Sequence, residues 1–504
     1  MKNICIIILS IAFITLSSCE KFLSQTPETT VSQENFYKSQ KDFEQAVVGI
    51  YSPLREIYNY AWQMSEMRSG NTYFIYDVAQ RGPKPVEDLA TFTVETNNAS
   101  VLRNWRNNYL IISRANQVLT RIDGMTFEQS VKDNLKGQAL FLRALSYFDL
   151  ASNFGDVPLF LDPPGSYAET FKNRTAVGEI YQQVIADATA AIPLLPAGPG
   201  IAEVGRATAG AASALLADVY LTLGKWPEAE AALRPVLNMG YSLLPDYSDI
   251  YRPGNKGNAE ILFEVNFVEA TSQPMFSTFP YAFLPDLEDP SILTGVTPET
   301  RNGDGSFNIP TPDMLAAYED PATDKRYNAS LDFYTGPSPL VGVVYNNTPY
   351  IKKYQHPHAL SGQTAQNWII YRYAEVLLMM AEVLNEQQRP ADALPFINQV
   401  RTRAGLPALT TTDQGQLREK IMHERHIELA FENKRWHDLV RTGKAVQVLN
   451  EFGAKVKANP GQYYYATGNA PPPNAFNVKD DFLVFPIPVT EIVINPELQQ
   501  NKGY

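Results

Sequence analysis

The sequence predicts a mainly α-helical fold, in which tetratricopeptide-like helix pairs form a scaffold that carries a loop-rich region and a few short strands. Three observations lead to this prediction. Residues Arg372–Glu386 are apolar around most of the helical circumference, as in a helix buried within other protein. Spacings that resemble a tetratricopeptide helix-turn-helix occur in 200–239 and again in 380–400. Segments 61–98 and 273–364 are rich in Gly, Pro and aromatic residues, so long loops are expected there.

The N-terminus has the pattern of an export signal. Lys2 precedes a largely apolar run from Ile4 to Leu16, which is too short to span a bilayer as a helix. The run ends in Leu-Ser-Ser-Cys19, which resembles a bacterial lipoprotein signal with Cys19 as the lipidated residue. We therefore expect residues 1–18 to be a signal peptide and 19–34 a lipidated tether. An ordinary secreted protein with a chance cysteine is the alternative.

Helical patterns follow in the first half of the body, over 36–58, 104–122, 136–154 and 176–192. The third of these is expected to end near Phe154-Gly155. Each of the two tetratricopeptide-like pairs has a proline inside its second helix: Pro235 in the pair within 200–239, and Pro395 in the pair within 380–400. These prolines predict a kink in each of the two helices.

The most strongly patterned stretch runs from Trp368 to Arg441. After the apolar helix, a second helix is expected to stop at Gly405 and Pro407. Residues 424–441 then predict one long amphipathic helix, on which Glu424, Glu428 and Glu432 are spaced four apart. These like charges repel unless cations such as Arg425 and Arg435 lie beside them.

Short strands are predicted over 260–268 and, interrupted by two prolines, over 481–493. The remaining C-terminal residues are expected to be coil. We divide the body into an N-terminal region, 35–265, and a C-terminal region, 266–504, and expect the two to pack as one body.

Composition excludes several classes of protein. The 504 residues carry a net charge of −12, and removal of residues 1–18 leaves 41 basic against 54 acidic residues, a net charge of −13. Without a basic run, such a chain is a poor candidate for binding nucleic acid or an anionic membrane surface. Only Cys5 and Cys19 are present, so the exported protein would contain no disulfide.

The usual motifs of catalysis and cofactor binding are absent from the sequence, and we predict no catalytic residue and no cofactor. His423 and His426 are one helical turn apart, but a third metal ligand is not evident. Residues 300–307 overlay part of a calcium loop, although a plain turn explains them more simply. With 54 acids present, a carboxylate pair for glycoside hydrolysis stays open as a minority hypothesis.

The loop aromatics are the best candidates for ligand contact. Trp105, Trp226, Trp368 and Trp436 fall on helical or strongly patterned positions and are expected in the core. Trp62, in contrast, begins a long loop. Sugars place their C–H faces on aromatic rings while amides bond their hydroxyls. The predicted ligand-binding residues are Trp62, Asn71, Tyr73, Tyr76, Tyr281, Phe283 and Tyr345. The alternative is that these side chains only anchor the loops to the body.

Six segments, taken together, resemble the SusD/RagB family of outer-membrane nutrient-binding lipoproteins of Bacteroidetes. They are the lipoprotein start with CEKFLSQTP, KGQALFLRALSYFDLASNFGDVPLF, RYAEVLLMMAEVLNE, INQVRTRAGLP, ERHIELAFENKRWHDLVR and INPELQQNKGY. The resemblance implies a tetratricopeptide-like body with ligand-binding loops and an outer-membrane lipid anchor on the cell exterior. It also implies a partner, a SusC-like TonB-dependent transporter, and no bond chemistry by the protein itself.

The resemblance does not fix the ligand, because the family's contacts lie in variable loops. An oligo- or polysaccharide is the leading hypothesis, since the loops are aromatic. Peptides are the second, and the acidic balance would then favour basic ones. A surface glycoside hydrolase is the third.

Overall fold

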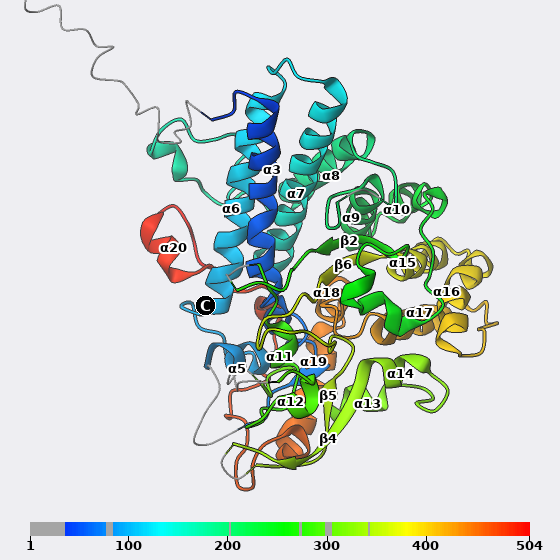
Figure 1. The fold of residues 1–504 in the computed structure, drawn as a ribbon. Helices are drawn as coiled ribbons and strands as arrows, with labels where there is room; N and C mark the ends of the chain where they lie inside the picture. Colours follow the sequence, from blue (N-terminus) through cyan, green and yellow to red (C-terminus); the bar gives the residue numbers. More distant parts are fainter. Residues whose placement is uncertain (1–35, 77–83, 201–202, 272–274, 298–304, 341–342) are drawn as a thin grey trace, which may run out of the picture.

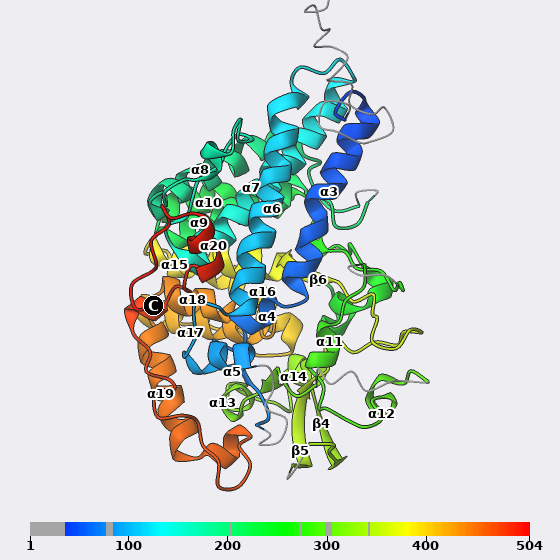
Figure 2. The same ribbon diagram turned by 90° about the vertical axis from the view of Figure 1, so that its left-hand side faces the viewer.

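The computed structural model describes residues 36–76, 84–200, 203–271, 275–297, 305–340 and 343–504. Three long helices lie side by side along one edge of the molecule (Figures 1 and 2): α3 (Gln40–Tyr58), α6 (Ala99–Ile122) and α7 (Gln129–Phe154). Helix α3 begins at Gln40 because Ser39 and Asp42 form a reciprocal capping box. Helix α7 ends at Phe154, where the sequence predicts it to end. None of the described helices is long and apolar enough to cross a membrane.

Helix pairs continue from these three across the molecule (Figure 1), in agreement with the predicted scaffold. They are α8 (Val177–Ala191), α9 (Ala209–Thr222), α10 (Trp226–Leu233), α15 (Tyr373–Glu386), α16 (Pro390–Ala404) and α17 (Gln414–Glu428). Gly405 ends α16 in the left-handed conformation, with φ of 85°, as predicted. Pro395 lies inside α16, whereas Pro235 lies beyond the end of α10, so no kink in α10 results from it. The mainly α fold is therefore confirmed.

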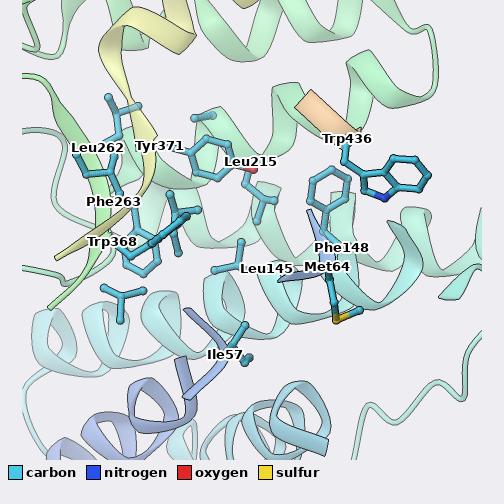
Figure 3. Packing of buried hydrophobic residues seen from close by; sticks show 14 of the residues in the cluster. Ile57, Met64, Leu145, Phe148, Leu215, Leu262, Phe263, Trp368, Tyr371 and Trp436 are labelled. Atoms are coloured by element: carbon cyan, nitrogen blue, oxygen red, sulfur yellow. The ribbon is translucent and has the colours of Figure 1, made fainter. Parts of the chain in front are cut away.

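Two short strands link the N-terminal and C-terminal regions. Strand β2 (Ile261–Val265) pairs antiparallel with β6 (Trp368–Arg372), which precedes the apolar helix α15. Strand β6 is absent from the sequence prediction because its apolar residues continue directly into those of α15. Both strands are buried along their whole length, and their side chains join the core cluster (Figure 3).

The prediction of one helix over 424–441 is wrong. Helix α17 ends at Glu428 and α18 (Arg435–Arg441) begins after a break in which Phe431 and Asn433 have φ of 66° and 64°. The turn directs Glu432 inward, where it meets Arg372 and Lys353. Glu424 and Glu428 of this stretch, and Glu375 and Glu382 of α15, are likewise buried.

The strand predicted over 481–493 is also wrong. A short 3-10 helix, Asp480–Phe482, is followed by an extended stretch and then by α20 (Val489–Ile494). The backbone N–H groups of the extended stretch donate to three separate partners: Phe485 to the Asn153 carbonyl, Ile487 to the Gln500 side chain, and Val489 to the Thr96 carbonyl. Because Pro486 and Pro488 lack an N–H, no regular ladder forms.

The irregular segments gather at the end of the molecule away from α3's first turn (Figure 2), and we call this the loop-rich end. It contains a hairpin, β4 (Leu331–Pro337) with β5 (Val344–Ile351), and the small pair of β1 (Thr72–Tyr73) with β3 (Ile309–Pro310). Five short helices accompany them: α5 (Lys84–Thr91), α11 (Phe279–Ala282), α12 (Ser291–Thr294), α13 (Pro312–Ala316) and α14 (Lys325–Ser330). Segments 61–98 and 273–364, predicted to be long loops, thus lie together.

Candidate ligand-binding region

The loop-rich end is joined to the helical scaffold by buried ion pairs. We define the central ion cluster as five cations, Arg326, Lys353, Arg372, Arg401 and Arg403, with five carboxylates, Asp324, Glu260, Glu424, Glu428 and Glu432. All ten side chains are almost fully buried. Equal numbers of each sign are expected in such a place, because an unpaired charge in the interior is very unfavourable.

Arg372 lies at the centre of this cluster. Its Nε donates to Glu432 at 2.8 Å, and its Nη1 donates to Glu260 at 2.9 Å. Its Nη2 also donates to the Glu428 carbonyl at 2.6 Å. Burial alone would raise the pKa of Glu432, but Arg372 and Lys353 outweigh this effect and lower it to about 2. Arg326 and Lys353 come from the predicted loop 273–364, so the cluster fixes the base of that loop.

A second buried contact fixes segment 61–76. Glu66 accepts a hydrogen bond from the backbone N–H of Asn433 and another, at 3.1 Å, from the Asn71 amide. The Asn71 amide oxygen lies 2.7 Å from Nε2 of His426. His426 therefore has a polar partner on the neighbouring segment. Among the described residues, no three His, Cys, Asp or Glu side chains are grouped so that they could hold a metal ion.

Six of the seven predicted ligand-binding residues lie in the protein interior. Trp62 donates its indole N–H to the Asn59 carbonyl at 3.0 Å and packs edge-on against Phe283, and Asn71 is bonded as described above. These residues, with Tyr73, Tyr281 and Tyr345, are at most 3% exposed. Trp62 therefore belongs to the core with Trp105, Trp368 and Trp436, and the prediction that set it apart from them is wrong. For these six, ligand contact would require movement of the surrounding segments.

Several buried tyrosine hydroxyls of the loop-rich end form hydrogen bonds. Tyr73 shares a hydrogen bond of 2.8 Å with Tyr465, and Tyr281 lies 2.6 Å from Nε2 of His358. Tyr345 donates to the Asp286 carbonyl at 2.9 Å. These contacts tie distant segments together, which is the anchoring role considered as the alternative for the loop aromatics.

Tyr76 is the predicted residue that reaches the surface. It is half-buried, and its ring stacks on Tyr465 with centroids 4.9 Å apart and planes at 26°. Its backbone N–H donates to the Tyr464 carbonyl at 3.0 Å. Tyr334, on β4, is also half-buried and packs edge-on against Tyr345. Tyrosine faces of this kind can receive the C–H face of a sugar ring.

Residues 460–478 complete this surface, and the sequence prediction does not include them. Tyr463 bonds to Asp313, and Tyr464 bonds to the Pro310 carbonyl. The run of three tyrosines at 463–465, between Pro and Gly, is the sequence signal that could have identified this segment. The calcium-like loop at 300–307 lies largely outside the described residues.

A groove of about 1500 Å³ lies elsewhere, between α3, α7, Pro196 and residues 203–207. Its lining mixes apolar and charged side chains, including Val48, Arg55 and Arg206. Size alone would make it the default ligand site. However, its tyrosine, Tyr51, has the Arg206 guanidinium over its ring, 5.1 Å from the centroid. The Tyr51 hydroxyl is also bonded to Gln138 and to the Ala207 N–H.

Comparison with known proteins gives consistent results for both regions. The family model described as "Starch-binding associating with outer membrane" matches residues 21–221, and the "SusD family" model matches 334–504. The SusD-like protein P25 of Formosa agariphila is 27% identical over 97% of each chain.

Solved structures share the fold. A SusD homolog from Bacteroides thetaiotaomicron has a TM-score of 0.76 at 22% identity and covers 95% of this chain and all of its own. Surface glycan-binding protein A from the same species, solved in complex with laminarihexaose, has a TM-score of 0.73 at 22% identity over 92% of this chain and 99% of its own. The two family matches together span most of the sequence, and the chain belongs to the SusD family.

Proposed function

We propose that this protein captures an oligo- or polysaccharide at the cell surface and delivers it to a SusC-like TonB-dependent transporter. The observation that carries the proposal is the family membership of both regions, one of which matches a model described as starch-binding. A protein of the same fold has been solved with a bound glucan hexasaccharide, laminarihexaose. The half-buried tyrosines of the loop-rich end, Tyr76 and Tyr334, support a glycan site there.

The ligand is proposed to lie on the loop-rich end, over Tyr76 and Tyr334. Both rings are half-buried, so part of each is accessible to a ligand. Tyr76 is further held by its stacking on Tyr465, which reduces the conformational entropy lost when a ligand binds. Asn346 and Asn347, exposed on β5, could bond sugar hydroxyls nearby.

Replacement of Tyr76 by Ala is expected to weaken glycan binding by roughly 1–3 kcal/mol, the scale of an aromatic contact residue. The melting temperature should change little because the ring is only half-buried. Binding of residues 20–504 to a broad glycan panel would be measured by calorimetry. Tyr167→Ala is the matched control, since Tyr167 is 77% exposed and lies outside the loop-rich end. If Tyr76→Ala leaves the affinity unchanged, the ligand lies elsewhere, and the groove between α3 and α7 is the next candidate.

The protein is proposed to be held in the outer membrane, facing the cell exterior, by lipid on Cys19, which lies outside the described residues. Cys19→Ala is expected to abolish metabolic palmitate labelling, because acylation needs the thiol. Cys5→Ala is the matched control: Cys5 lies within the predicted signal peptide, so its loss should leave labelling intact. Persistent labelling of the Cys19 variant would contradict the anchor.

We propose that the protein does not cleave its ligand. The acids most strongly patterned in the sequence, Glu424, Glu428 and Glu432, are buried and bonded to arginines. A carboxylate so placed cannot protonate a glycosidic oxygen or attack a sugar. Incubation of each bound glycan with the protein should return it intact, and shortened products would favour the hydrolase hypothesis.

A further inference from the structure

A small cavity lies within the scaffold, away from the loop-rich end. Its volume is about 140 Å³, and it lies between the α3–α4 connection, α7, β6 and α18, where α4 is Ala61–Met64. Aromatic side chains form much of its wall, among them Phe148, Trp368 and Trp436. Figure 3 labels Phe148, Trp436 and Met64, which all line this cavity. The wall therefore offers aromatic surface to a ligand.

Asn433 lines this cavity and is held in an unusual backbone conformation. It lies in the break between α17 and α18 with φ of 64°. Its N–H donates to Glu66, and its carbonyl accepts a hydrogen bond of 2.8 Å from the Ser65 hydroxyl. The backbone is thus fixed on both sides, which restricts where the side chain can point. Strained positions of this kind are concentrated at functional sites.

The Asn433 side chain has no hydrogen-bonding partner among the described residues. Its amide nitrogen and its amide oxygen are both buried, and neither forms a hydrogen bond with any described residue. A buried amide that forms no hydrogen bond is unfavourable, so native structures rarely contain one without a ligand or ordered water. The amide can offer a donor and an acceptor to the same small molecule.

A carboxylate lies across the same cavity. Asp149 accepts hydrogen bonds from Asn104 at 2.8 Å, Asn108 at 2.6 Å and Asn153 at 3.0 Å. No cation pairs with it among the described residues, and burial raises its pKa despite the three amides. The oxygen Oδ1 accepts only from Asn153, so it has capacity for a hydroxyl donor. Lys434, also on the wall, is already paired with Glu375 at 2.9 Å.

We propose that this cavity binds a free monosaccharide or a polyol of similar size. An apolar cavity of about 150 Å³ accommodates benzene, so about 140 Å³ suits a ligand of six to about ten heavy atoms. The aromatic wall would receive the C–H face of the sugar, and the Asn433 amide would bond two of its hydroxyls. Asp149 would accept a hydrogen bond from a further hydroxyl. Ordered water alone is the competing occupant. The site is independent of the glycan surface at the loop-rich end.

The test is a titration of residues 20–504 with xylose, arabinose, erythritol and glycerol, followed by saturation-transfer NMR and by the fluorescence of the wall tryptophans. Concentrations up to about 100 mM are needed because so small a ligand binds weakly. At least one compound is expected to saturate. Asn433→Gly should weaken that binding about tenfold, the scale of one lost bonding pair. Glycine accepts the positive φ, so the variant removes only the amide and should not lower the melting temperature.

Gln388→Gly is the matched control, since Gln388 also has positive φ, 61°, but lies exposed in the turn between α15 and α16. It should bind the monosaccharide as the unmodified protein does. Tyr76→Ala should also keep this binding while losing the oligosaccharide, which separates the two sites. Absence of saturation by every compound, or equal saturation of Asn433→Gly, would overturn the proposal. A crystal of the unmodified protein soaked in the saturating compound gives a second readout, in which sugar at Asn433 supports the proposal and water alone refutes it.

Discussion

Replacement of Arg372 by Met is expected to lower the free energy of unfolding by roughly 3–5 kcal/mol, the usual loss when one partner of a buried ion pair is removed. Arg372 bonds Glu260, Glu428 and Glu432, all of them almost fully buried. The methionine would fill much of the volume but leave the central ion cluster with four cations for five carboxylates. Since whole domains are stable by only about 5–15 kcal/mol, this loss is large.

Urea denaturation followed by circular dichroism would measure the change as a lower midpoint with an unaltered slope. Arg418→Met is the matched control, because Arg418 pairs with Glu386 at the surface and its side chain is 43% exposed. An exposed pair contributes about 0–1 kcal/mol, so this variant should unfold almost as the unmodified protein does. Similar stability for both variants would show that the cluster relaxes or admits water when Arg372 is lost.

The cluster also shows what the sequence could not predict. The spacing of Glu424, Glu428 and Glu432 correctly indicates that these acids need cations beside them. Yet the cations that pair with Glu428 lie 25, 56 and 102 residues away in the chain. Arg425, expected beside the three acids, instead pairs with Asp438 at 3.1 Å. Tertiary partners of this kind leave no local pattern, whereas the helices and the cap at Gly405 follow from local signals and were predicted.

The loop aromatics were misplaced for a related reason. A residue such as Trp62 in a stretch without helical or strand periodicity looks like a surface platform, because periodicity is what identifies buried positions in a sequence. Here segment 61–76 passes through the interior, between α6 and the break after α17. Glu66 accepts from the Asn433 N–H in that break, and Asn71 bonds to Glu66 and to His426 of α17. Tyr76, at the end of that passage, is where the segment returns toward the surface.

Glu66→Gln is expected to stabilise the protein at pH 8 but not at pH 5. Burial raises the pKa of Glu66 from 4.5 to about 7, although the Asn433 N–H, the Asn71 amide and Lys353 partly oppose this effect. Between pH 4.5 and about pH 7, Glu66 holds a proton in the folded protein that it has already released in the unfolded chain. The free energy of unfolding therefore falls as pH rises through this range. The loss is complete above about pH 7 and amounts to about 3 kcal/mol. A glutamine cannot ionise, so the variant should escape this loss.

The measurement is the difference in melting temperature between variant and unmodified protein at pH 5 and pH 8. Glu419→Gln, an exposed substitution on α17, should give a difference that does not change between these pH values. A constant difference for Glu66→Gln would mean that the carboxylate is stabilised as an anion, with Lys353 outweighing burial. Because Glu66 bonds segment 61–76 to Asn433, a positive result would also show that this junction beneath the loop-rich end is held more firmly as pH falls from 7 toward 4.5.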